Sequence, residues 1–342
     1  MRIIVLLFCA LATLTLFGCS EIEEKTKHPN AEEKEVAEQE ELHTDTEKTT
    51  SSLKVPDGET FLYNGQVFQI IYFYKPFLDY IEQAEAQPDH LDDLFLETVV
   101  DPMAGGNGQA LLKQYYLSTP MRPALLEEYL QSLSDNQEII HTLIVDALKE
   151  SADRLQPGVS KYVYVLPANP DDAFTMKKMD GVTGVAFDEN TVLLQIAPPF
   201  LTDAPLKHTV AHEYHHSVLK EKSEVSTGNT LLDFVLIEGK ADTFARILYP
   251  NVRTGYSDFS TDTDEKDTWT VLKDQKASTD PVLQQLFFHG DGSKGLPRWA
   301  NYKIGNKIMD RFIQENPDVS IVEWTNMPSE EILEKSEYGD MQ

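Results

Sequence analysis

The sequence contains almost no cysteine, which excludes folds that depend on disulfides. Both cysteines, Cys9 and Cys19, lie within the first 19 of the 342 residues. Once a leader ending there is removed, no pair of thiols remains to be oxidised, so packing alone must stabilise the folded part. The same scarcity argues against a structural zinc site, because such sites usually hold the ion with cysteine thiolates.

Positive charge is also scarce. Lysine and arginine together number 29 against 57 aspartates and glutamates, which gives a formal net charge of -28. A protein that binds nucleic acid needs the opposite sign to neutralise phosphates, so we expect no nucleic-acid partner. With 41% hydrophobic and 25% charged residues, the composition is otherwise that of an ordinary globular protein.

The N-terminus carries an uncharged, mainly apolar run over residues 3–18. This run is shorter than the roughly 20 residues of a membrane-spanning helix and follows a positive charge, so residues 1–19 are predicted to be a signal peptide. Residues 16–19 (LFGC) resemble a bacterial lipobox. This implies that Cys19 receives a lipid and anchors the mature protein to the cell membrane, outside the cytoplasm. A signal anchor or ordinary secretion is the alternative interpretation.

The segment that follows the leader is acidic and contains no aromatic residue. Residues 20–55 cannot bury enough apolar surface to fold, and we predict that they form a disordered tether. The composition changes again after this segment. We divide the remaining chain into two predicted regions, residues 56–155 and residues 156–342.

The first of these regions is predicted to begin with a hairpin and to continue as helices. Residues 59–63 and 66–72 read as two strands joined by an Asn-Gly pair, whose residues both tolerate a positive φ. From residue 76 to about residue 155, apolar residues recur every three or four positions, which predicts helices. The second region begins with short β-rich runs, and helices resume near residue 205. The β-rich runs cover residues 161–166, 182–187 and 191–196.

The motif that carries chemistry is His212-Glu213-Tyr214-His215-His216, a match to H-E-x-x-H. A helix is predicted around it, because apolar residues recur at helical spacing and Pro205 suits a first turn. At about 100° per residue, the imidazoles of His212 and His216 lie about 40° apart on one face, so both can bind one metal ion. Glu213 projects beside them, where it can act on a water rather than bind the metal.

A catalytic zinc site commonly has three protein ligands, so a third ligand is needed beyond the two histidines. The acidic candidates after the motif are Glu221, Glu224, Asp233, Glu238 and Asp242. Glu221 is too close on the same helix and Glu224 lies in a polar break, whereas Glu238 lies on a second predicted helix over residues 230–248. An antiparallel helix pair would bring Glu238 level with the histidines. Asp242, one turn further, could accept the remaining N–H of a ligating histidine.

This joint pattern resembles the gluzincin metallopeptidases, in which H-E-x-x-H is followed by Glu-x-x-x-Asp on a later helix. More closely, residues 212–216 (HEYHH) and 238–242 (EGKAD) are similar to a family of predicted Zn-dependent proteases of bacterial lipoproteins and cytosolic relatives, YjaZ-like. The resemblance covers roughly residues 137–323, including residues 299–305 (WANYKIG). It implies an α+β, zincin-like fold, with a short mixed β-sheet packed on the H-E-x-x-H helix and a mostly helical remainder. It also implies Zn²⁺ as cofactor, with the ligands His212, His216 and Glu238.

The function expected from these residues is that of a membrane-anchored zinc endopeptidase, with residues 156–342 as its metallopeptidase domain. Metal-activated water would hydrolyse peptide bonds of a peptide or protein substrate, with Glu213 as general base. Tyr302 and His289 are the candidate donors for the developing oxyanion. Residues 191–196 resemble the edge strand on which zincins bind an extended substrate, with an ordinary core strand as the alternative. The competing interpretation is a non-catalytic zincin-fold lipoprotein that acts as a binding or chaperone-like module.

Overall fold

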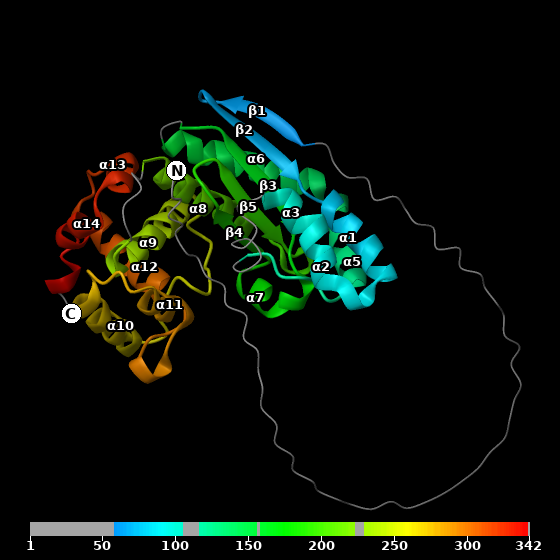
Figure 1. Cartoon of the computed structure of the whole chain (residues 1–342). Coiled ribbons are helices and arrows are strands. Elements are labelled where there is room, and N and C mark those ends of the chain that lie inside the picture. Colours follow the sequence, from blue (N-terminus) through cyan, green and yellow to red (C-terminus); the bar gives the residue numbers. More distant parts are fainter. Residues whose placement is uncertain (1–57, 105–115, 156–157, 223–228, 341–342) are drawn as a thin grey trace, which may run out of the picture.

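The computed structural model describes residues 58–104, 116–155, 158–222 and 229–340. The predicted signal peptide with Cys19 and the predicted acidic tether lie outside the described residues. Within them, the chain is an α+β protein with one sheet and many helices (Figure 1). No helix in this part of the chain combines the length and the hydropathy needed to cross a membrane.

The elements follow one another closely along the chain. The strands are β1 (Glu59–Tyr63), β2 (Gln66–Tyr72), β3 (Lys161–Pro167), β4 (Val182–Ala186) and β5 (Thr191–Ile196). The α-helices are α1 (Lys75–Ala86), α2 (Leu91–Phe95), α3 (Asp101–Ala104), α5 (Pro123–Asp135), α6 (Gln137–Arg154), α7 (Ala173–Lys178), α8 (Asp203–Lys222), α9 (Leu231–Leu248), α10 (Asp262–Gln275), α11 (Pro281–His289), α12 (Ala300–Glu315), α13 (Ile321–Asn326) and α14 (Ser329–Lys335). Short helical turns are η1 (Pro88–His90), η2 (Leu96–Val100), η3 (Pro170–Asp172), η4 (Pro198–Phe200), η5 (Gly292–Lys294) and η6 (Tyr338–Asp340).

The sheet is mixed and has the strand order β1-β2-β3-β5-β4. Strands β1 and β2 form the predicted hairpin, and its turn residues Asn64 and Gly65 have φ angles of 48° and 81°. Strands β2, β3 and β5 run parallel, whereas β4 runs antiparallel beside β5. The two predicted regions therefore share one sheet, and the boundary drawn between residues 155 and 156 stays a prediction.

The strand order shows that the expectation of an edge strand over residues 191–196 was wrong. These residues form β5, which pairs with β3 on one side and with β4 on the other. In the described sheet the edges are β1 and β4. Three consecutive buried residues, Val192, Leu193 and Leu194, give β5 the continuous apolar run of a strand that is covered on both faces. That run indicates an interior strand, which is the alternative the sequence had left open.

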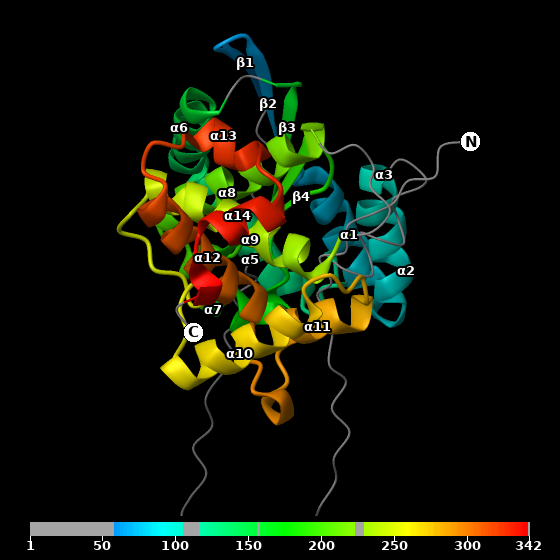
Figure 2. The same cartoon turned by 90° about the vertical axis from the view of Figure 1, so that its left-hand side faces the viewer.

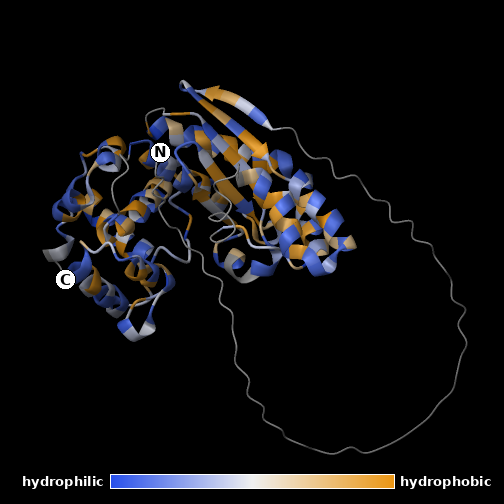
Figure 3. Cartoon of the chain, in the orientation of Figure 1, coloured by the Kyte–Doolittle hydropathy of each residue, from blue (hydrophilic) through white to orange (hydrophobic). Residues whose placement is uncertain are grey.

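Helix α8 joins the sheet to the remaining helices. It packs against α6, β4 and β5 on one side and against α9 on the other, and α9 in turn packs closely on α12. Figures 1 and 2 show helices α9 to α14 gathered beyond α8, while α1, α2, α3 and α5 lie at the opposite end of the sheet. Figure 3 shows hydrophobic residues along the strands and on alternating parts of the helices, and the buried ones form a core that spans the sheet and the helices around α8.

Candidate metal centre

The two histidines of the motif lie in the middle of α8, which is a single helix from Asp203 to Lys222. The side of α8 that faces the sheet is fixed by Tyr214. Its ring packs 6.3 Å from that of Phe68 on β2, and its hydroxyl donates to Gln66 Oε1 at 2.8 Å. Because this contact sets the rotation of α8, His212 and His216 project from another side of the helix, toward α9.

Glu238 reaches the same point from α9. Thr230 and Asp233 form a capping box that begins this helix, since each side chain bonds the backbone N–H of the other residue. Nearly all of α9 is buried, and it crosses α12 at Gly239 and Gly305. A Cβ atom on Gly239 would lie 2.5 Å from the carbonyl carbon of Gly305, so the two backbones touch. The cap and the crossing together fix the position of Glu238 along and around α9.

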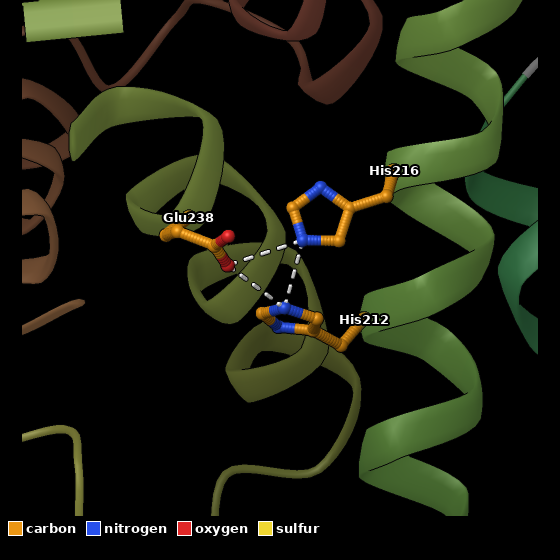
Figure 4. A group of neighbouring side chains, drawn as sticks. All are labelled: His212, His216 and Glu238. Atoms are coloured by element: carbon orange, nitrogen blue, oxygen red, sulfur yellow. Dashed lines mark hydrogen bonds and ion pairs between the residues drawn. The ribbon is translucent and has the colours of Figure 1, made fainter. Parts of the chain in front are cut away.

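The three predicted ligands converge in the structure (Figure 4). The Nε2 atoms of His212 and His216 are 2.9 Å apart, and Glu238 Oε2 lies 3.3 Å from the first and 3.2 Å from the second. The imidazole planes are inclined by 81° to one another. His212 and Glu238 are buried and His216 is partly exposed, so the cluster is open toward solvent on the side of His216.

These separations fit a zinc ion. Zinc binds imidazole nitrogen at about 2.0–2.1 Å and carboxylate oxygen at about 2.0–2.2 Å, which puts two ligand atoms of a tetrahedral site roughly 3.3–3.5 Å apart. The two distances to Glu238 Oε2, at 3.2 and 3.3 Å, agree with that value, and the separation of 2.9 Å between the nitrogens is slightly short. Two neutral imidazoles and one carboxylate are also the donor types of catalytic zinc sites that keep a position for water.

The local electrostatics favour a cation at this point. Burial alone would raise the pKa of Glu238, but the charges and hydrogen bonds of His216 and His212 hold it far below its usual value. Burial alone would lower the pKa of His212, yet the hydrogen bond with Glu238 and the negative charges of Glu213, Glu238 and Asp242 raise it to about 9. Positive charge between these carboxylates is therefore stabilised, and a divalent cation can take the place of the proton.

Glu213 lies against strand β4 and does not join the cluster of three ligands. Its side chain is 6% exposed, and its Oε2 accepts a hydrogen bond of 2.7 Å from the backbone N–H of Ala186. The structure thus puts the carboxylate of Glu213 next to the sheet edge and beside the histidine that precedes it in α8. Its assignment as a general base stays a prediction.

The two candidate oxyanion donors lie in different surroundings. Tyr302, at the start of α12, stacks on His212 with the ring centroids 6.1 Å apart and the planes inclined by 20°. His289, at the end of α11, forms a hydrogen bond of 3.0 Å with Gln285 Oε1 on its own helix. Of the two, Tyr302 is the one that the structure brings to the candidate ligands.

Asp242 lies one turn beyond Glu238, as predicted, but its hydrogen bonds go elsewhere. It accepts from Asn306 Nδ2 at 2.6 Å and from Ser257 Oγ at 3.3 Å, and its Oδ1 is 3.5 Å from His208 Nε2. Within the described part of the chain, Nδ1 of His212 is buried without a hydrogen-bond partner. The role of Asp242 in orienting a ligating histidine stays a prediction.

Two further residues near the site were not predicted from the sequence. His208 is one turn before His212 on α8 and is 1% exposed. The spacing of four residues is visible in the sequence and indicates that His208 lies on the same helix face as His212. Tyr256 follows α9 in a connecting segment and packs on Tyr302, with ring centroids 5.0 Å apart. Burial, together with the charges of Asp242, Glu213 and Glu238, raises the pKa of Tyr256 well above its usual value. No local pattern in the sequence distinguishes Tyr256.

More than half of the chain matches a known protein family. A family model described as "Predicted Zn-dependent protease (DUF2268)" matches residues 140–334, which is more than half of the chain. The matched part contains α8, α9 and α12, and with them all three residues of the cluster. Neither the curated proteins nor the solved structures gave a match.

Proposed function

The chain belongs to the DUF2268 family of predicted Zn-dependent proteases, and from this premise we propose that it is a zinc-dependent endopeptidase with a zincin-like arrangement. The observation that carries the proposal is the convergence of two imidazole nitrogens and one carboxylate oxygen from two facing helices. His212, His216 and Glu238 would hold the ion. Zinc bound there would supply Lewis acidity, which polarises a peptide carbonyl and makes water more acidic.

Glu213 acts as the general base in this proposal. Its carboxylate takes a proton from the attacking water as the new C–O bond forms, and it returns that proton to the amine nitrogen as the C–N bond breaks. No covalent intermediate with the chain is needed. Tyr302 lies beside His212 and is the candidate for stabilising the oxyanion that develops on the carbonyl oxygen.

The substrate would be a peptide or protein bound in extended form along β4. This strand is an edge of the described sheet, it packs on α8, and one of its backbone N–H groups already bonds Glu213. Main-chain pairing with an edge strand recognises any extended peptide. Strand β4 thus takes the place that the sequence had suggested for residues 191–196.

We further propose that the enzyme works outside the cytoplasm, anchored to the cell membrane by a lipid on Cys19. This part of the proposal rests on the apolar leader, on the LFGC sequence over residues 16–19, and on the acidic composition of the segment that follows. The net charge of -28 favours protein substrates over nucleic acid.

The substitution Glu213→Gln tests the catalytic proposal against the binding or chaperone-like alternative. The amide has the same shape and can still accept from Ala186 N–H, but it cannot take a proton. We expect zinc content to be unchanged and cleavage of a peptide library to fall about 100-fold or more. Glu127→Gln, at an exposed position of α5, is the matched control. Cleavage that persists in Glu213→Gln would contradict the assigned base, and an absence of chelator-sensitive cleavage in the wild type would contradict the enzyme itself.

A further inference from the structure

Strand β4 directs one set of backbone groups away from the sheet, at the sheet edge. The odd-numbered residues along β4 and at its two flanks bond β5, since Phe187 N–H donates to Thr191 O just after the strand and Gly181 O accepts from Ala197 N–H just before it, both at 2.8 Å. In an antiparallel pair the residues between them point their N–H and C=O groups the other way. The N–H of Ala186 therefore faces away from β5, and it is this group that donates to Glu213 Oε2 at 2.7 Å.

Glu213 reaches Ala186 by passing directly over Gly184. A Cβ atom on Gly184 would lie 2.4 Å from Glu213 Cγ, 3.0 Å from Cδ and 3.0 Å from Oε1. Ordinary contact of a Cβ atom begins at 3.4 Å, so any side chain at residue 184 occupies the path of Glu213. Glycine in a strand normally weakens it, and it often marks a place where another group approaches closely. Here that group is the carboxylate-bearing side chain of Glu213.

We propose that Gly184 and the backbone N–H of Ala186 are the positioning elements of the general base, an inference that rests on the proposed function. The N–H fixes Oε2, and the missing side chain of Gly184 leaves room for the rest of the carboxylate. Among the described residues, Oε1 of Glu213 forms no hydrogen bond, so Oε1 is the oxygen left to receive the proton of water. The edge strand thus orients the base through Ala186 N–H, so main-chain pairing with a substrate would use other outward groups of β4.

The proposal predicts a specific defect in Gly184→Ala. The added Cβ displaces the Glu213 carboxylate by about 1 Å, and a misplacement of this size costs on the order of 100-fold in rate. We expect kcat to fall by that factor while KM changes less than about twofold and zinc content stays at the wild-type level. Gly292→Ala is the matched control, since a Cβ at residue 292 meets no atom within 4 Å. A wild-type kcat in Gly184→Ala, or a parallel loss of zinc, would overturn the proposal.

A second measurement tests the contact without using activity. Thermal unfolding of the metal-free full chain is compared for the wild type, Gly184→Ala, Glu213→Ala and the double variant. Glu213→Ala removes Cγ and Cδ, the atoms that the new Cβ would strike. We expect Gly184→Ala to lower the melting temperature when Glu213 is present. In the Glu213→Ala background the same substitution should leave the melting temperature unchanged or raise it, because the clash is absent and replacing glycine restricts the unfolded chain. Equal shifts in both backgrounds would show that Gly184 does not act on Glu213.

The two experiments also separate this inference from the proposed function. If the wild type shows no chelator-sensitive cleavage, the peptidase proposal fails, whatever the unfolding data show. If the wild type cleaves peptides and Gly184→Ala cleaves them equally well, only the positioning role fails.

Discussion

Gly305→Ala probes the helix crossing that places Glu238. A Cβ atom on Gly305 would lie 2.5 Å from Val235 O, 3.0 Å from Gly239 Cα and 3.1 Å from Gly239 N. All three atoms belong to the backbone of α9, so no side chain can rotate away. Relief requires α9 and α12 to separate by roughly 1 Å, the difference between 2.5 Å and ordinary contact at 3.4 Å.

The expected magnitude follows from this overlap. Inserting a methyl group into a well-packed core costs about 1–3 kcal/mol, and a contact between two helix backbones belongs at the upper end of that range. A loss of about 3 kcal/mol corresponds to a fall in melting temperature of about 5 °C, because the unfolding entropy of a folded unit of this size is roughly 0.6 kcal/mol/K. Zinc affinity should also fall, because the displaced helix carries Glu238.

Calorimetry of the metal-free protein measures the loss of stability in Gly305→Ala, and titration with zinc measures the loss of zinc affinity. Gly292→Ala, with open space around residue 292, is the control and should behave as the wild type. An unfolding free energy of Gly305→Ala within about 0.5 kcal/mol of the wild type would refute the argument that the crossing has no room for a side chain.

Two further substitutions test the charges in and near the site. Glu238→Gln keeps the shape of the side chain but removes the anionic ligand. Zinc affinity, measured by competition with a chelator, should fall by about 100-fold or more, because even the outer partners of metal ligands contribute about 10–100-fold. Unchanged affinity would exclude Glu238 as a ligand. His208 is buried, and its burial lowers its pKa to about 4, which means that the unfolded chain takes up the proton near pH 6.5 and the folded chain only near pH 4. The unfolding free energy of the metal-free wild type should therefore decrease by up to about 3 kcal/mol as the pH falls from 6.5 to 4. The unfolding free energy of His208→Gln should lack the decrease that His208 causes, whereas that of His90→Gln, an exposed control, should keep it. Parallel pH profiles of the unfolding free energy for the wild type and His208→Gln would contradict the assignment of this decrease to His208.

Features that depend on neighbouring residues were predictable from the sequence. The hairpin at Asn64 and Gly65 is confirmed because the turn residues determine its geometry. The helix predicted over residues 230–248 is confirmed as α9, which begins at the capping box of Thr230 and Asp233. The proximity of Glu238 to the histidines followed from counting residues along two helices joined by a short connection.

Features that depend on distant segments were not predictable in this way. Strand order is one of these features, and the sequence therefore predicted an edge strand over residues 191–196, which form β5, although the edge is β4. The contact between Gly184 and Glu213 is another, because it joins residues of a strand and a helix that no local pattern connects. Tyr256 reaches Tyr302 from a segment outside any helix or strand, so periodicity could not identify it.

The most direct test of the central claim is a crystal structure of the zinc-loaded protein with anomalous data collected at the zinc absorption edge. We expect one anomalous peak per chain, at about 2.0–2.2 Å from His212 Nε2, His216 Nε2 and a carboxylate oxygen of Glu238. A peak bound by other residues, or no peak together with a Glu238 side chain turned away from both histidines, would contradict the account.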